Sequence, residues 1–407
     1  MYQSTICNPA CSQYYYVQQY LHMVYRRHWI ERIEQAWKRK NVVWLSGVRR
    51  AGKTFLCRSL EDVHYFDCEL PRTRRLMADP EFFLENHKDL RIVLDEIHRL
   101  PDPTELLKIA ADYYPSTKVL ATGSSTLGAS TRLRDNLAGR KEDVWLTPMA
   151  LDDMGYFSNP SLGHRFLRGG LPPFFMAETL PEREYQDWFD AFWAKDILEL
   201  FRLERRHSFL RFSELLLAQS GGMYEATRFA APCEVSRTTI SNYLSVLEST
   251  YVMHIVRPFS SRKATEIVSA PKVYAFDTGF VCAFKGWEKL RDDDMGLLWE
   301  HFVLNELQAA LPTANRRPNI RYWRDKGGYE IDFVISGKAD RTTVIDCKWS
   351  SAAFEPAAIL AFRRRYPLGH NYVVAADADN SYTRAYRGVD VQFISLRQLS
   401  MTLIAEL

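Results

Sequence analysis

Short, continuous runs of apolar residues recur along the chain up to about residue 150, separated by segments with the apolar spacing of helices. Such runs are typical of strands buried on both faces, as in a parallel sheet covered by helices. An amphipathic, basic helix is expected over 22–40, and a second helix over 55–60. The pattern therefore predicts an α/β fold with a parallel sheet, whose strands are expected at 42–45, 63–67, 91–96, 118–121 and near 144–146.

From residue 169 onward the chain no longer alternates between short apolar runs and helical segments. The Gly-Gly-Leu-Pro-Pro stretch beginning at Gly169 is a natural hinge, and the aromatic and aliphatic spacing over 181–204 predicts a long connecting helix. The next segment, 209–279, reads as a winged helix-turn-helix whose third helix is capped by Ser236. Its helices are expected at 212–218, 224–231 and 237–250, and the third would bury a stripe formed by Ile240, Tyr243, Leu244 and Leu247.

The last part of the chain mixes one helix with strands. The helix is expected over 296–311, and the first two strands, 320–325 and 329–335, are joined by a Lys-Gly-Gly hairpin turn at 326–328. A further strand is expected over 343–348. This order predicts a second α/β unit.

Composition narrows the class of protein without deciding it. The 407 residues include 46% hydrophobic and 25% charged residues, which are ordinary globular values, and the net charge is only +3. No apolar run approaches the length needed to span a membrane, and the N-terminus lacks the apolar core of a signal peptide. The seven cysteines include no C-x-x-C pair, and Cys7 and Cys11 have no matching Cys/His pair. We therefore expect no membrane partner and a reduced, cytoplasmic location.

Residues 47–54 read G-x-x-x-x-G-K-T between the first expected strand and helix, which is the context that a phosphate-binding loop requires. Backbone N–H groups of such a loop surround phosphate oxygens, and the helix N-terminus adds partial positive charge. Lys53 would neutralise the β- and γ-phosphates, and the Thr54 hydroxyl would ligate Mg²⁺. The nucleotide-binding residues are therefore expected to be Gly47, Val48, Arg49, Arg50, Ala51, Gly52, Lys53 and Thr54.

The strand expected at 91–96 ends in two adjacent acids, which a parallel sheet delivers to the edge where its ligands bind. Asp95 would hold Mg²⁺ through water, and Glu96 would orient and polarise the attacking water, although an acidic pair can also be a solvated helix cap. After the strand at 118–121, Ser124 or Ser125 would sense the γ-phosphate, unless they only form a turn. A lone arginine such as Arg140 is usually a surface residue, but its position suits a charge that reaches a γ-phosphate, in particular that of a neighbouring subunit.

These residues together resemble the AAA-type ATPases of bacteria and archaea. More narrowly, they resemble the group that carries a C-terminal domain of unknown function related to restriction endonucleases. The resemblance covers nearly the whole chain and implies ATP, rather than GTP, as the nucleotide. The motifs that carry it, besides the phosphate loop, are Leu94-Asp95-Glu96, Thr122-Gly123-Ser124-Ser125, Leu137-Ala138-Gly139-Arg140, Gly169-Gly170-Leu171-Pro172, Trp193-Ala194-Lys195-Asp196-Ile197 and Pro271-Lys272-Val273-Tyr274-Ala275-Phe276-Asp277-Thr278-Gly279.

The winged helix is the candidate DNA-binding element. Residues 202–272 contain ten Lys or Arg and six Asp or Glu, and a local excess of positive charge favours binding to phosphates. The exposed N-terminal end of the third helix would meet bases and phosphates, with the tip of the wing beside it. The expected contacts are Arg237, Thr238, Ser241, Asn242, Arg262 and Lys263. The alternative is a winged helix that docks proteins, because such folds are widely reused.

The C-terminal unit carries a second chemical pattern. Asp332, then Asp346 and Lys348 as Asp-x-Lys, with Glu300 on the preceding helix, resemble the PD-(D/E)xK nuclease pattern. By that resemblance Asp332 and Asp346 would hold Mg²⁺, Glu300 would complete the site, and Lys348 would activate water and stabilise the pentavalent phosphate. The alternatives are cross-strand ion pairing and a nuclease-like site that only binds DNA.

Five segments are therefore expected: an N-terminal helical segment (1–40), an AAA-type ATPase core (41–168), a helical linker (169–208), the winged helix-turn-helix (209–285) and a PD-(D/E)xK nuclease-like domain (286–407). The predicted function is a Mg²⁺-dependent ATPase that acts on DNA as a homo-oligomer, with a hexameric ring as one arrangement. ATP hydrolysis would drive translocation along, or remodelling of, duplex or branched DNA. The alternatives are an ATP-gated DNA nuclease and a nucleotide-switched signalling or defence scaffold.

Overall fold

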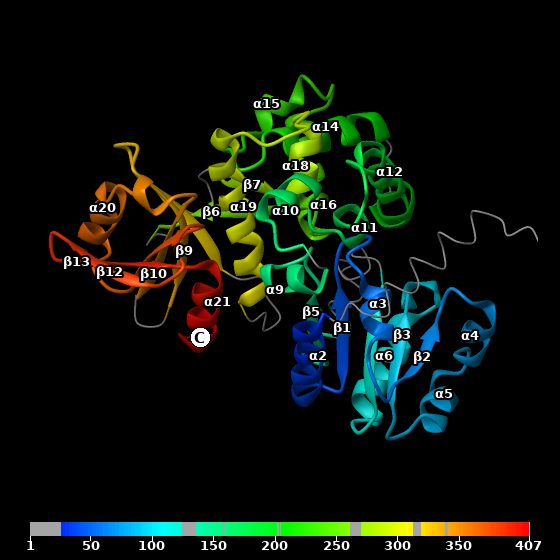
Figure 1. Ribbon diagram of the computed structural model, residues 1–407. Coiled ribbons are helices and arrows are strands. Elements are labelled where there is room, and N and C mark those ends of the chain that lie inside the picture. The colour runs from blue at the N-terminus through cyan, green and yellow to red at the C-terminus, as the bar shows by residue number, and fades with distance from the viewer. Residues whose placement is uncertain are drawn as a thin grey trace, which may run out of the picture.

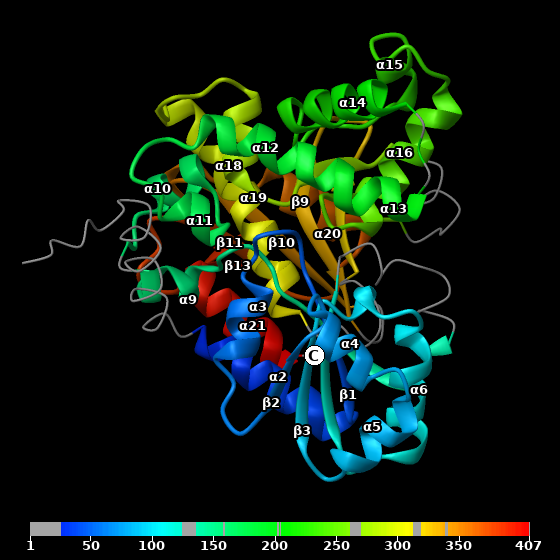
Figure 2. The same ribbon diagram turned by 90° about the vertical axis from the view of Figure 1, so that its right-hand side faces the viewer.

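The computed structural model describes residues 26–123, 136–157, 159–201, 203, 205–260, 270–311, 319–337 and 341–406. It contains two sheets, a five-stranded sheet in the first part of the chain and an eight-stranded sheet in the last part. The helices α12 (Glu182–Phe192), α14 (Arg206–Ala218) and α16 (Arg237–Ser249) gather on one side of the first sheet (Figures 1 and 2). They lie away from α4 (Pro71–Leu76), α5 (Pro80–Asn86) and α6 (Pro103–Tyr113). Among the described residues, no helix is both long and apolar enough to cross a membrane.

The first sheet is entirely parallel, and its strand order is β2-β3-β4-β1-β5. The strands of the expected parallel sheet are present, as β1 (Val42–Ser46), β2 (His64–Asp67), β3 (Arg91–Asp95), β4 (Lys118–Thr122) and β5 (Lys141–Trp145). The helices among them are α2 (Arg27–Arg39), α3 (Lys53–Arg58), α4 (Pro71–Leu76), α5 (Pro80–Asn86), η1 (Ile97–Arg99) and α6 (Pro103–Tyr113).

The central strands β1, β3 and β4 are buried on both faces, which is why they are mostly apolar, whereas the edge strands β2 and β5 include charged and partly exposed residues. Val43 and Leu45 point to the face covered by α2 and α3, where Trp29 packs. Val42 and Trp44 point to the opposite face, covered by α5 and α6. Alternate residues of one strand therefore enter two different cores.

Helical elements connect the two sheets. The helix expected over 181–204 is formed by α12 (Glu182–Phe192), a π-helical turn η3 (Trp193–Ile197) and α13 (Leu198–Phe201). It is preceded by α9 (Leu151–Met154), η2 (Gly155–Phe157), α10 (Leu162–Arg168) and α11 (Pro172–Phe175).

Three helices and a hairpin follow, in the order expected from the sequence: α14 (Arg206–Ala218), α15 (Ala226–Ala230), α16 (Arg237–Ser249), β6 (Met253–Pro258) and β7 (Lys272–Ala275). The Ser236 hydroxyl caps α16 by accepting a hydrogen bond from the Thr239 N–H at 3.1 Å. The predicted apolar stripe of α16, from Ile240 to Leu247, is buried.

The hairpin does not stand apart from the last unit. Strand β6 pairs in parallel with β8, so the order of the eight-stranded sheet is β12-β13-β11-β10-β9-β8-β6-β7. Its remaining strands are β8 (Ile320–Arg324), β9 (Glu330–Ser336), β10 (Thr342–Lys348), β11 (Asn371–Ala375), β12 (Tyr382–Tyr386) and β13 (Val389–Ile394). The helices are α18 (Thr278–Phe284), α19 (Asp292–Ala310), η4 (Ser351–Ala353), α20 (Ala357–Arg365) and α21 (Leu396–Glu406). The sheet thus crosses the boundary expected at 285/286.

A buried joint links α10 to the segment between β7 and α18. The Arg165 guanidinium lies 3.4 Å from the Asp277 carboxylate, and both side chains are fully buried. Asp277 also accepts hydrogen bonds from the N–H groups of Gly170 (2.6 Å) and Gly279 (2.9 Å). Gly169 has φ +76°, and a Cβ there would lie 2.0 Å from Asp277 Oδ1, so only glycine fits. The Gly-Gly-Leu-Pro and Phe-Asp-Thr-Gly motifs therefore form one contact, and α10 packs with the second half of the chain.

Candidate functional site

The loop between β1 and α3 has backbone geometry that depends on its glycines. A Cβ at Gly47 would lie 2.7 Å from the carbonyl oxygen of Leu146, which follows β5. Gly52 has φ +99°, a region that other residues rarely adopt, and it directly precedes α3. Glycine is therefore needed at position 47, where the chain after β5 comes close, and at position 52, where the backbone turns into α3.

Lys53, the first residue of α3, points back into the loop. Its ammonium donates to the carbonyl oxygens of Gly47 (2.9 Å) and Val48 (3.3 Å). Burial lowers the pKa of Lys53, while the charges of Glu96 and Asp196 act in the opposite direction. The loop thus holds a cation at its centre, where nucleotide phosphates bind in loops of this kind.

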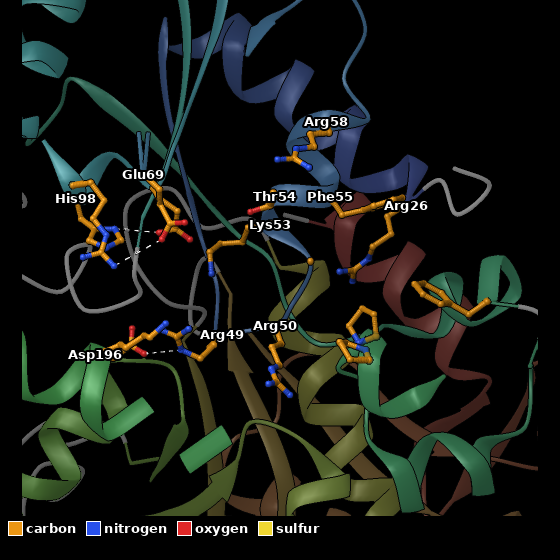
Figure 3. A pocket seen from close by; sticks show the side chains of 17 residues that line it. Arg26, Arg49, Arg50, Lys53, Thr54, Phe55, Arg58, Glu69, His98 and Asp196 are labelled. Atoms are coloured by element: carbon orange, nitrogen blue, oxygen red, sulfur yellow. Dashed lines mark hydrogen bonds and ion pairs between the residues drawn. The ribbon is translucent and has the colours of Figure 1, made fainter. Parts of the chain in front are cut away.

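A cavity of about 480 Å³ opens beside the loop (Figure 3). Its wall includes Lys53 and Thr54 from the loop side and Glu96 from the end of β3. Segments outside the sheet complete the wall, and they contribute Arg26, Phe157, Pro172, Pro173, Lys195 and Asp196. The cavity therefore combines charged and apolar side chains around the loop, which suits a nucleotide.

Asp95 and Glu96 occupy the same edge of the sheet as the loop. The buried Asp95 carboxylate accepts hydrogen bonds from the hydroxyls of Tyr65, at 2.7 Å, and Thr122. Glu96 has φ +54°, and its carboxylate lies 3.1 Å from His98 Nδ1. Burial alone would raise the pKa of Glu96, but the His98 hydrogen bond and the Lys53 charge together lower it. Glu96 is therefore held as a carboxylate beside the cavity.

Two residues that sequence reasoning did not assign hold these acids in place. Thr122 ends β4, which lies between β1 and β3, and its hydroxyl also accepts a hydrogen bond from the Glu96 N–H at 3.0 Å. Tyr65 comes from β2. Thr122 could have been found from the sequence, because it is the first residue of the Thr-Gly-Ser-Ser motif. Ser124 and Ser125 lie outside the described residues.

Arg140 lies at the opposite edge of the sheet. It precedes Lys141, which pairs with Val42 at the start of β1, whereas Lys53 follows the end of that strand. Its guanidinium is 2.7 Å from the Asp112 carboxylate on α6. A strand of five residues spans roughly 15 Å, so Arg140 does not belong to the cavity of its own chain. Arg140 thus forms a surface ion pair in its own chain, and its role toward a neighbouring subunit stays a prediction.

The expected DNA contacts on α16 lie on one exposed surface. Arg237, Thr238, Ser241 and Asn242 are all exposed at or near the N-terminal end of this helix. Arg262 and Lys263 lie outside the described residues.

The predicted nuclease-like residues converge in the C-terminal unit. The Lys348 ammonium is 2.9 Å from Asp346, and the Cys347 N–H donates to Asp332 at 2.7 Å. Burial raises the pKa of Asp332 to about 6 and that of Asp346 to about 7, and neighbouring carboxylates, Glu300 for Asp332 and Asp332 for Asp346, add to both shifts. Charges crowded in this way are costly unless a cation compensates them.

A second lysine lies among these acids. Lys272, from β7, is buried, and its ammonium contacts Glu300 at 3.3 Å and also Glu330. Burial would lower the pKa of Lys272, but the charges of Glu300 and Asp332 raise it. Sequence reasoning missed Lys272, although it belongs to the Pro-Lys-Val-Tyr-Ala-Phe-Asp-Thr-Gly motif. Strand β7 of the hairpin thus supplies a positively charged side chain, Lys272, to this site.

The two sites differ in how well they suit a divalent metal. Beside the phosphate loop, the Thr54 hydroxyl and the Asp95 carboxylate are hard oxygen donors of the kind that Mg²⁺ prefers. In the C-terminal unit an ammonium lies between Glu300 and Glu330, and no group of three or more His, Cys, Asp or Glu among the described residues is arranged as a metal site. The metal role of Asp332 and Asp346 stays a prediction.

Family models match three successive segments of the chain. Residues 39–154 match an AAA domain, residues 159–291 match a domain of unknown function (DUF8612), and residues 295–398 match another (DUF4143). The AAA match, the parallel strand order and the phosphate loop support an AAA-type P-loop ATPase core. The description of the C-terminal match does not mention restriction endonucleases, so that relationship stays a prediction.

Two relatives from mycobacteria extend over most of the chain. The uncharacterized proteins Rv2008c of Mycobacterium tuberculosis and Mb2031c of Mycobacterium bovis are each 29% identical over 392 residues, which cover 89% of this chain and 85% of theirs. Among solved structures, the Walker-type ATPase PABY2304 of Pyrococcus abyssi aligns with 64% of this chain and 96% of its own, at 15% identity and a TM-score of 0.42. A structure titled DNA replication initiation factor aligns with 60% of this chain and 88% of its own, at 14% identity and a TM-score of 0.25. With TM-scores below 0.5, these alignments do not establish a common overall fold.

Proposed function

We propose that this protein is a Mg²⁺-dependent ATPase that acts on DNA as a homo-oligomer. ATP hydrolysis would drive translocation along, or remodelling of, duplex or branched DNA. The observation that carries the ATPase part is the convergence of Lys53, Thr54 and Glu96 at one cavity beside a parallel sheet, with the buried Asp95 directly before Glu96 at the end of β3. A hexameric ring is the assembly to test, because Arg140 lies away from the cavity of its own chain, and a nucleotide that it contacts would belong to a neighbouring subunit.

Each residue of the site has a distinct task. The loop N–H groups and Lys53 would bind the β- and γ-phosphates. Thr54, together with Asp95 through water, would hold Mg²⁺, which when bound would offset negative charge on the phosphates. Glu96, kept ionised by His98 and Lys53, would orient the attacking water and accept its proton. Thr122 and Tyr65 fix the acids by hydrogen bonds.

DNA binding is proposed for the exposed end of α16. Its polar side chains stand together on one surface, and the remaining expected contacts, Arg262 and Lys263, belong to the segment that joins β6 to β7. Such a surface would contact phosphates chiefly by charge, so binding should depend strongly on salt and little on sequence.

The test measures phosphate release with and without linear, forked and four-way DNA. We expect DNA to stimulate turnover in the wild type, and Lys53→Ala to abolish tight nucleotide binding. A variant lacking the charges of Arg237, Arg262 and Lys263 should lose the stimulation but keep basal turnover, and its salt slope of DNA binding should fall by up to about one unit per lost contact. The control removes three exposed lysines that precede or belong to the ATPase core: Lys38, Lys40 and Lys88.

The outcomes separate the candidate functions. ATP turnover that no DNA stimulates would favour the scaffold that docks proteins. DNA binding that is unchanged in the triple variant would instead place the DNA site elsewhere on the protein. Metal-dependent cutting in the same reactions would favour the ATP-gated nuclease, for which the convergence of Asp332, Asp346 and Lys348 is the supporting observation. Cutting should then disappear in Asp332→Ala without loss of ATP turnover, because the two sites lie on different sheets.

A further inference from the structure

The phosphate loop forms hydrogen bonds with α12 and η3, which come after the five strands of the first sheet in the chain. The carboxylate of Asp196, in the π-helical turn η3, accepts a hydrogen bond from Arg49 Nε at 3.2 Å. One helix earlier in the same run, the indole N–H of Trp188 donates to the Arg49 carbonyl oxygen at 3.0 Å. A single loop residue is therefore held through both its side chain and its backbone (Figure 3 shows the Arg49–Asp196 pair). π-Helical turns are rare in proteins, and those that occur are often found at functional sites.

This ion pair lies in the wall of the cavity that is proposed to bind the nucleotide. Arg49 and Asp196 line the same cavity as Lys53 and Glu96. Asp196 is only 4% exposed, so its carboxylate has little access to water if Arg49 leaves. A guanidinium binds phosphate at least as well as carboxylate, because its planar fork matches both anions. A γ-phosphate and Asp196 would therefore compete for one cation, whereas a diphosphate lacks the competing group.

The turn that carries Asp196 is connected through α14 to the helix proposed to bind DNA, α16. The ring of Trp193, in the same turn, lies 5.3 Å from that of Phe209 on α14, centroid to centroid. The ring of Phe209 in turn lies 5.2 Å from that of Tyr243 on α16. Packed rings thus connect the loop-contacting turn to the helix whose exposed end is the candidate DNA surface.

We propose that Asp196 is the residue by which the protein distinguishes ATP from ADP, because it holds Arg49 until a γ-phosphate takes it. Release of Arg49 leaves a buried carboxylate without its partner, and the turn η3 responds by shifting against α14. Asp196 is thus a positioning residue that acts through Arg49 and reports the nucleotide to α16. This inference rests on the proposed ATPase function.

The test compares the affinities for a fluorescent non-hydrolysable ATP analogue, mant-AMPPNP, and for mant-ADP. Asp196→Asn removes the competing charge, so we expect it to raise the affinity ratio of triphosphate to diphosphate by roughly tenfold. In an Arg49→Ala background the same change should raise the ratio less than twofold. Asp190→Asn is the matched control, because Asp190 lies on α12, is half-exposed and pairs with Arg206 away from the cavity.

A second readout follows the turn itself. Hydrogen exchange of peptides covering 188–201 should rise with AMPPNP relative to ADP in the wild type and show no such difference in Asp196→Asn. An unchanged ratio in a folded Asp196→Asn protein, or a tenfold gain that persists without Arg49, would overturn the inference. Failure of the wild type to bind either nucleotide would instead refute the proposed ATPase function.

Discussion

Lys272 gives the sharpest prediction about the C-terminal site, because its buried ammonium already supplies a cation to the acids Glu300 and Glu330. We consider Lys272→Met, which keeps the length of the side chain and removes its charge. At an effective dielectric of about 20, one ion pair at the 3.3 Å separation from Glu300 is worth roughly 5 kcal/mol. Removing one partner of a buried pair typically costs about 3–5 kcal/mol. Lys272 also contacts Glu330, so a cost near the upper end is expected.

A divalent cation should recover much of this loss in the variant alone. Binding at one hundred times its Kd would add about 2.7 kcal/mol, which corresponds to roughly 8–13 °C in Tm for a unit of this size. The assay is thermal unfolding with and without Mn²⁺ for the wild type, Lys272→Met and the control Lys289→Met, whose lysine is exposed. We expect Mn²⁺ to stabilise Lys272→Met selectively. Equal stabilisation of the wild type, or none of the variant, would refute the reasoning that Lys272 takes the place of a metal.

Three further predictions concern other sites. Glu96→Gln should bind ATP and lose most hydrolysis, since an amide does not accept the proton of water; equal turnover in Glu96→Gln and wild type would remove Glu96 as the base. Mixing inactive Arg140→Ala and Lys53→Ala chains should restore part of the ATP turnover through composite sites, whereas a monomeric ATPase whose rate per chain does not depend on concentration would contradict this. Burial raises the pKa of Glu306 to about 8, so its contribution to stability is full below about pH 4.5 and is lost as the pH rises through 8. In Glu306→Gln, Tm should therefore fall less than in the wild type between pH 5 and pH 9, and identical pH profiles would disprove the shift.

Much of the nucleotide site could be predicted because its chemistry is local in the chain. A phosphate loop is one continuous strand, turn and helix, and the acids Asp95 and Glu96 adjoin at the end of one apolar run. Apolar runs likewise predict a parallel sheet, because both faces of such a sheet are buried. The cap and the buried stripe of α16 follow from residues within a few turns of one another.

The sequence by itself therefore determined the phosphate loop, the acidic strand end and the order of the helices and strands along the chain. Only the tertiary structure decided which distant segments complete the sites. Arg49 and Asp196 are separated by 147 positions in the sequence. Lys272 lies on β7 and contacts Glu300 and Glu330, because the hairpin of one expected unit is part of the sheet of the next. Side-chain periodicity reports the face of one element and nothing about the partner that covers it. Ion pairs between distant elements depend on how those elements pack, so they leave no pattern along the chain.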